Sequence, residues 1–297
     1  MTTLSDILQT VSMDLGITDS FYATGGTATT TVNTSFGNES EPPDEERFKN
    51  NYLFVRRDAG GAGADPEGKW ALISAYAPAT YTITHATFTT APASGDEMLL
   101  VKQNNFPILE MIAAVNRALM KLGEHEFTDI TSITIADGQT EYSLPAGVTE
   151  LIDVLVQRND DSNDNDWKVI PGCKIIMSTS AMSSEPVLYI PQQSTGYDIM
   201  LKYRGYHPVV SAYNSVIHKF IPKDLLVAAT KMTLLESYIN SKSGSAKEHW
   251  GRMYQEALRQ FNEGRIMLPV QRLNKKQKRG LLWPAFDSDT DFNVETV

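Results

Sequence analysis

The sequence predicts an α+β fold. We expect a bundle of three to four helices with an antiparallel β insertion, an additional β domain on the N-terminal side and an extended C-terminal arm. Apolar residues recur at helical spacing in separate blocks, short runs rich in Thr, Tyr, Val and Ile lie between turn residues, and the residues after position 267 follow neither period. The expected parts are an N-terminal helix at 1–16, a β-rich domain at 17–102, a core at 103–267 and the arm at 268–297.

The first expected helix covers residues 4–15 and has one apolar stripe. Thr3 is suited to the N-cap because its hydroxyl can accept a backbone N–H, and Asp6 lies three positions further on. Gly16 is suited to ending the helix. A helix this short is marginal in water by itself, so we expect it to pack on a later part of the chain. The stripe consists of Leu4, Ile7, Leu8, Val11 and Leu15.

Residues 17–102 are rich in Gly, Thr, Ala and Pro, a composition that indicates a small antiparallel β domain. Pairs such as Gly25-Gly26 and Gly60-Gly61 are typical of turns. The acidic stretch from Glu39 to Glu46 is interrupted by two prolines, which favours a solvated loop over a cation site. The expected strands are 29–32, 52–56, 81–88 and 98–101.

The core begins with a strongly amphipathic helix at 106–122. Pro107 is suited to its first turn, and Gly123 is suited to ending it. A β insertion at 130–205 follows, in which polar loops separate short apolar runs. Its expected strands are 132–135, 141–144, 151–158, 167–170, 187–190 and 198–203.

The helix expected at 223–240 is apolar on two sides, which predicts that it is buried between two partners. A neighbouring helix at 246–263 follows a short turn, so the pair is expected to form a hairpin. Ser245 and Glu248 have the spacing of a capping box, and Arg252/Glu256 and Arg259/Glu263 are spaced for ion pairs. The residues expected to pack in the bundle or between subunits are Leu225, Leu226, Ala229, Met232, Leu235 and Ile239.

Composition and charge exclude several classes of protein. With 36 acidic and 26 basic residues the formal net charge is −10, which disfavours stable wrapping of nucleic acid. The lone Cys173 permits no internal disulfide, which suits a reducing site of synthesis. The start of the chain lacks the pattern of a secretory signal, and no apolar run approaches the roughly 20 residues of a membrane span. We therefore expect no membrane partner.

No motif predicts catalysis, a cofactor or a metal centre. The five histidines are scattered singly, and the run Gly60–Gly63 leads into Asp65-Pro66 instead of a phosphate-binding helix. The loop 160–166 offers oxygen ligands on alternate positions, as calcium loops do, but glycine and glutamate are missing where such a loop needs them. We interpret it as a hairpin-tip loop, with a calcium site as the alternative. We expect no enzyme and no cofactor.

The arm contains a basic run, an apolar cluster and an acidic end. Clustered Lys and Arg attract either phosphate or an acidic protein surface. An apolar cluster is costly in water unless pockets receive it, which favours docking on a protein over nucleic-acid binding or an idle tail. The expected docking residues are Arg272, Lys275, Lys276, Lys278, Arg279, Leu281, Leu282, Trp283 and Phe286.

Several motifs, in the same order along the chain, resemble those of the head-to-tail adaptor (connector or neck) proteins of tailed bacteriophages, in particular short-tailed phages. The similar region runs from about Asn105 to Val270. The residues that carry the resemblance are Asn116-Arg117-Ala118-Leu119 in the first core helix, Thr140–Pro145, Glu185–Ile190, Leu201–Arg204 with Pro208, and Ile221–Leu226.

The resemblance implies a structural virion protein of the neck, at the capsid–tail junction, that is synthesised in the host cytoplasm. In that family a helical bundle with a β insertion forms a homo-oligomeric ring of twelve subunits beneath the portal and extends the DNA channel. The arm 268–297 would dock on portal and neighbouring subunits. Further partners would be tail or nozzle proteins, with genomic DNA passing through without specific binding.

The alternative function is a carbohydrate-binding or host-attachment module of a phage tail. It is indicated by the Thr- and Tyr-rich stretch 76–90, which also suits a plain exposed sheet. A wall hydrolase ranks below both functions, because no paired carboxylates stand in a recognisable setting.

Overall fold

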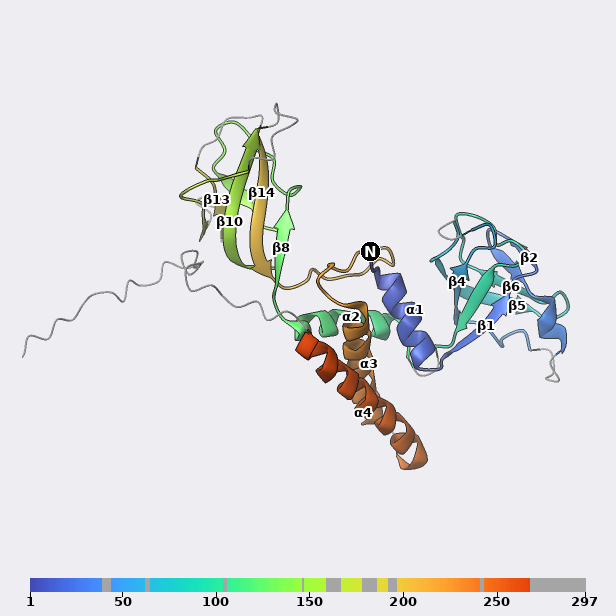
Figure 1. The fold of residues 1–297 in the computed structure, drawn as a ribbon. Coiled ribbons are helices and arrows are strands. Elements are labelled where there is room, and N and C mark those ends of the chain that lie inside the picture. Colours follow the sequence, from blue (N-terminus) through green and yellow to red (C-terminus); the bar gives the residue numbers. More distant parts are fainter. Residues whose placement is uncertain are drawn as a thin grey trace, which may run out of the picture. The chain divides into compact units, whose positions relative to one another are not determined.

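The computed structural model describes residues 1–38, 44–61, 65–103, 106–145, 147–158, 167–177, 186–191, 197–240 and 243–267. The fold is α+β, as predicted, and it divides into two compact units, Met1–Lys121 with Val209–Leu268 and Leu122–Pro208. Figure 1 shows helices and an antiparallel sheet in the first unit and strands in the second. The helices are α1 (Leu4–Asp14), α2 (Ile108–Leu122), α3 (Lys223–Ile239) and α4 (Gly244–Met267).

The first unit contains a seven-stranded antiparallel sheet in the order β1-β7-β4-β5-β6-β3-β2. One face buries an apolar core in which Phe36 lies between the rings of Phe21 and Phe48, at centroid distances of 5.0 and 5.1 Å. A short 3-10 helix, Thr34–Asn38, carries Phe36 to this core. The strands are β1 (Thr18–Tyr22), β2 (Gly25–Thr27), β3 (Thr30–Val32), β4 (Tyr52–Arg57), β5 (Trp70–Ala77), β6 (Thr82–His85) and β7 (Glu97–Val101).

Two predictions for this sheet need correction. Gly25-Gly26 is not a turn but part of β2, and Gly26 lies so close to the Thr30 carbonyl that a Cβ there would collide with it. No strand was predicted at β5, because a register shift between Ile73 and Ala75 interrupts the alternation of its buried and exposed residues. A bulge of this kind hides a strand from a period-two search.

The N-cap predicted for α1 at Thr3 is confirmed, and Asp6 completes a capping box with it. The Thr3 backbone N–H donates to Asp6 Oδ2 at 2.7 Å, and the Asp6 N–H donates to Thr3 Oγ1 at 3.3 Å. The apolar stripe of the helix is buried, as its marginal length requires.

The segment 209–222 connects the parts of the first unit. The N–H of Leu4 donates to the Ser215 carbonyl at 2.9 Å, and the Tyr213 ring stacks on Trp70 of β5 at a centroid distance of 5.7 Å. Because all these contacts use backbone or ring atoms of one irregular segment, helical or strand periodicity does not reveal them.

Helix α3 is buried on most of its circumference and packs on both α4 and α1. This confirms the inference that a doubly apolar helix has two partners. Its two buried threonines, Thr230 and Thr233, donate their hydroxyls to the carbonyls of Leu226 and Ala229 at 2.8 and 2.9 Å, so neither leaves an unsatisfied polar group in the core.

The predicted helix bounds are close to the observed ones, with two corrections. The helix expected from 106 begins at Ile108, whose N–H donates to Gln103 Oε1 at 2.8 Å. The helix expected at 246–263 runs from Gly244 to Met267. Ser245 therefore lies inside α4, and the predicted capping box with Glu248 is wrong.

The second unit is built from two antiparallel sheets, in the orders β11-β10-β14-β8 and β12-β13-β9, that share one apolar core. No strand forms at the expected position 132–135, where only Thr134 bridges Asp198, and the insertion begins at His125 instead of 130. The strands are β8 (His125–Asp129), β9 (Glu141–Ser143), β10 (Val148–Arg158), β11 (Lys168–Val169), β12 (Lys174–Met177), β13 (Pro186–Tyr189) and β14 (Tyr197–Gly205).

A pair of glycines joins β10 to β14 at the base of the second unit. Gly147 has φ +83°, and a Cβ at Gly205 would collide with the Gly147 carbonyl. That carbonyl accepts the Tyr206 N–H at 3.1 Å. The two backbones approach too closely for any side chain at either position.

Candidate interaction surfaces

The predicted docking residues of the arm, from Arg272 to Phe286, lie outside the described residues, as does the loop 160–166. The structure therefore places neither of these predicted sites. The predicted packing face of α3 is described in full. Leu225, Leu226, Ala229, Met232 and Leu235 are buried within the chain, and Ile239 is half-buried.

The end of the α3–α4 hairpin is held by three aromatic rings. Phe106 lies 4.7 Å from the Tyr238 ring of α3 and 5.4 Å from the Trp250 ring of α4, centroid to centroid. Because Phe106 lies two residues before the start of α2, this cluster joins the start of α2 to both members of the hairpin. Edge and tilted ring contacts of this kind add to the stabilisation that burial alone provides.

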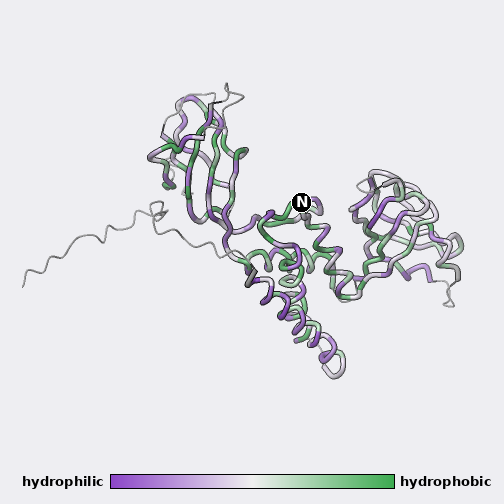
Figure 2. The backbone as a smooth tube through the Cα atoms, viewed as in Figure 1, coloured by the Kyte–Doolittle hydropathy of each residue, from purple (hydrophilic) through white to green (hydrophobic). Residues whose placement is uncertain are grey.

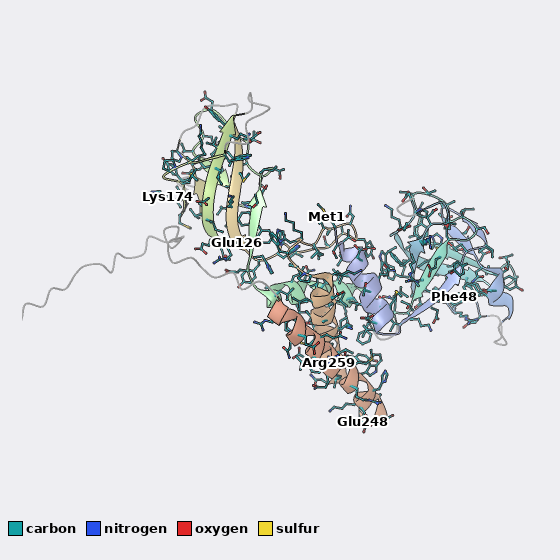
Figure 3. The ribbon with its side chains drawn as sticks, viewed as in Figure 1. Met1, Phe48, Glu126, Lys174, Glu248 and Arg259 are labelled. Carbon is teal, nitrogen blue, oxygen red and sulfur yellow. The ribbon has the colours of Figure 1, made fainter. Side chains whose placement is uncertain are left out.

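The outward face of α4 is charged. Hydrophilic residues recur along the helix in Figure 2, and Figure 3 labels Glu248 and Arg259 on it. The predicted Arg259–Glu263 ion pair is present at 2.8 Å, but Glu256 pairs with Arg259 at 2.7 Å and not with Arg252 as predicted. Hydrogen bonding from Arg259 holds the pKa of Glu256 below its usual value. Exposed pairs of this kind contribute little to stability.

A hollow of about 550 Å³ lies among α1, α3 and α4. Lys231, whose side chain is only 12% exposed, lines it and donates to Asp14 at 2.8 Å and to Gln260 at 3.2 Å. The polar contacts of Lys231 therefore join all three helices. Arg252 and His249 also line the hollow.

The titratable groups form no catalytic arrangement in the part of the chain that the structure describes. No cluster of three or more His, Cys, Asp or Glu side chains there could hold a metal ion. His85 is buried between Thr31 and the Ala86 carbonyl, and burial lowers its pKa. Burial raises the pKa of Cys173 to about 11, so its thiol is poorly nucleophilic. Nor is any helix among the described residues long and apolar enough to span a bilayer.

Three motifs that carry the family resemblance have clear structural roles. In the second unit, Tyr142 of β9 pairs with Leu188 of β13, which brings the Thr140–Pro145 and Glu185–Ile190 motifs together in one sheet. The Arg204 side chain is 14% exposed and forms ion pairs with Glu126 at 3.2 Å and Glu150 at 3.1 Å, across β8, β14 and β10. These motifs therefore hold the strands of the second unit together.

A fourth motif, Asn116–Leu119, contains a clamp on α2 in the first unit. Asn116 donates from Nδ2 to the Val210 carbonyl at 2.8 Å, and its Oδ1 accepts the Val210 N–H at 2.8 Å. An amide side chain that satisfies both backbone groups of one residue substitutes for a missing strand or helix partner. It fixes segment 209–222 against α2.

Sequence reasoning missed an exposed apolar surface beside this clamp. Leu109 and Met120 of α2 are 74% and 64% exposed, Ala113 between them is exposed, and Val209 next to the clamped residue is 81% exposed. We call these four residues the α2 patch. On a helical wheel Leu109, Ala113 and Met120 fall on one side, away from the buried stripe, which was the signal available in the sequence.

Comparison with known proteins identifies the family. A search of curated proteins finds no match to this chain. A family model described as SU10 adaptor protein matches residues 95–273, well over half of the chain. The matched region contains α2, the whole second unit and the α3–α4 hairpin. The chain therefore belongs to the SU10 adaptor protein family and is a structural adaptor of a bacteriophage virion.

Proposed function

We propose that this adaptor forms a homo-oligomeric ring beneath the portal, extends the DNA channel and connects the capsid to the tail. The observation that carries the proposal is the family match over residues 95–273. The structural roles of the shared motifs are consistent with an assembly protein.

The acidic composition supports the channel role. A net charge of −10 repels a phosphate backbone, so DNA can slide past without being held. We expect no retention of duplex DNA by the purified chain at physiological salt in a filter-binding assay. Tight binding would contradict a passive channel.

The ring is tested with the full-length chain and the portal protein of the same phage. Sedimentation velocity and negative-stain imaging of the mixture should show a closed ring attached to portal, and native mass spectrometry gives the number of subunits, which we expect to be twelve. A chain that stays monomeric at micromolar concentration with portal present would overturn the proposal.

We further propose that the arm docks on portal and neighbouring subunits. Deletion of residues 271–297 should abolish portal attachment while the circular dichroism of the remaining chain keeps its helical and strand signals. A finer test replaces Trp283 and Phe286 by Ser, because buried aromatic residues dominate the energy of protein interfaces. Replacing Asp287 and Asp289 by Ser is the matched control. Equal portal binding together with equal self-association by both double variants would contradict docking through the apolar cluster.

A further inference from the structure

We propose that the α2 patch receives the apolar segment Leu281–Phe286 of a neighbouring copy of this chain. The inference rests on the proposed function for the presence of that neighbour. It goes beyond the proposed function because it names the receiving surface on the subunit. The α2 patch consists of Leu109, Ala113, Met120 and Val209, all exposed in the first unit.

The patch is a preformed surface. Asn116 lies one helical turn from both Ala113 and Met120, and its two hydrogen bonds of 2.8 Å hold Val210 on that side of the helix. The neighbouring Val209 is thereby kept beside α2 at little further cost in conformational entropy. Glu110 and Arg117, both exposed, provide a polar rim on the same helix. Asn116 is the polar position within the stripe, and both of its bonds to Val210 are satisfied, so it leaves no unpaired polar group between Ala113 and Met120.

The composition of the patch suits an aromatic segment. Met120 has an unbranched, polarizable side chain that adapts to the shape of a ring. Leu109 and Ala113 lie one helical turn apart, so one bulky side chain can contact both of them. Trp283 and Phe286 are the large aromatic residues of the arm's apolar cluster.

The position of the end of α4 supports the segment Leu281–Phe286 as the occupant of the α2 patch. Gly264, in the last turn of α4, faces the Leu225 side chain near the start of α3, where a Cβ would lie 3.0 Å from Leu225 Cδ1. Helix α3 directly follows segment 209–222, which contributes Val209 to the patch. The described chain therefore ends at Met267 on the side of the bundle where this segment enters α3.

The chain after Met267 is long enough to carry the apolar segment to a distant surface. Leu281 follows Met267 by 14 positions, and an extended chain of that length reaches roughly 45–50 Å. The linker therefore allows the apolar segment to reach a surface up to that distance from Met267, as docking on an adjacent copy requires.

Cysteine pairing between two copies tests the proposal directly. One sample of full-length chain carries Ala113→Cys and the other Ala285→Cys, since both substitutions are small and leave the larger apolar side chains in place. After mixing under mild oxidation we expect a disulfide-linked dimer of one copy of each. Replacing Ala113→Cys by Asp137→Cys, in an exposed turn, should give none. Cys173 stays in all samples because its pKa of about 11 leaves little thiolate at pH 8.

A second experiment measures the self-association of the chain instead of disulfide cross-linking. Leu109→Ser with Met120→Ser should weaken self-association by about tenfold or more, because two side chains lose their apolar burial in the interface. Glu248→Ser with Gln255→Ser, two exposed residues of α4 outside the patch, should change it less than about threefold. All four side chains are exposed, so each double variant should retain the melting temperature of the parent chain.

The outcomes separate the two proposals. This inference is overturned if rings form, the cross-link between positions 113 and 285 does not form, and both double variants associate equally. The proposed function would then still stand. A cross-link that forms only within a chain carrying both cysteines, and never between copies, overturns it in favour of docking on its own subunit. A chain that remains monomeric with portal overturns both.

Discussion

Helices α3 and α4 are neighbours in one hairpin, yet they are stabilised in different ways. Ten consecutive or nearly consecutive residues of α3, from Leu225 to Leu235, are buried, whereas the outward side of α4 carries ion pairs around Arg259. Burial of α3 is shared between α1 and α4, so it depends on tertiary packing. We therefore expect the two helices of this hairpin to differ widely in their sensitivity to substitution.

The largest loss of stability should come from truncating a buried side chain of α3. Leu226 has no exposed surface, so Leu226→Ala should lower the free energy of unfolding by about 2–5 kcal/mol through lost burial and the cavity left behind. The matched control is Leu109→Ala, at a side chain that is 74% exposed. It should cost less than about 0.5 kcal/mol. Urea unfolding followed by circular dichroism measures both. Equal effects would mean that the α3 core is not as tightly packed as described.

The next effect comes from two glycines on α4 itself. Gly264 faces Leu225, and Gly251 has no atom of another element within 4 Å of the place where a Cβ would lie. Gly264→Leu should destabilise the hairpin by about 1–3 kcal/mol through overpacking. Gly251→Ala should stabilise the chain by about 0.5–1 kcal/mol, because alanine loses less backbone entropy on folding. Opposite shifts of the urea midpoint are expected, and shifts of the same sign would contradict the described contact with Leu225.

The helices were predictable from the sequence because their signal is periodic and local. The two apolar sides of α3 predicted both its burial and its two partners, and Thr3 with Asp6 predicted the start of α1. The error at Ser245 has a simple cause. Several polar residues precede α4, and capping-box spacing alone does not select which of them starts the helix.

Strands and surfaces were less predictable for physical reasons. The bulge in β5 breaks its alternation, and β12 is too short and too exposed to show one. The Asn116 clamp joins residues 94 positions apart, and no local pattern encodes such a contact. The sequence contains the apolar residues of the α2 patch outside the buried stripe of the helix. Only the structure shows that no described residue covers Leu109 and Met120.

A smaller effect on stability is expected at Lys231, the charged residue of α3 that contacts both α1 and α4. Lys231 of α3 pairs with Asp14 of α1 at 2.8 Å and with Gln260 of α4 at 3.2 Å. Asp14→Asn should lower the free energy of unfolding by about 0.5–1 kcal/mol, since Lys231 keeps one partner and part of its hydration. The difference between Asp14→Asn and the parent chain should shrink at 1 M salt, where charges are screened over about 3 Å. A loss that is independent of salt would point to packing instead of charge.

The smallest effect should be at Arg259, although this side chain has the largest number of ion-pair partners on α4. Its guanidinium lies 2.7 Å from Glu256 and 2.8 Å from Glu263, and these contacts raise its pKa. All three side chains are exposed, so water and salt compete for every one of the contacts. Arg259→Gln should therefore leave the melting temperature unchanged within experimental error. The prediction holds if this change is smaller than the change caused by Asp14→Asn. A larger change would mean that the outward face of α4 is covered in the sample measured, as it would be if this face were buried against another copy, and sedimentation at two concentrations would distinguish that case.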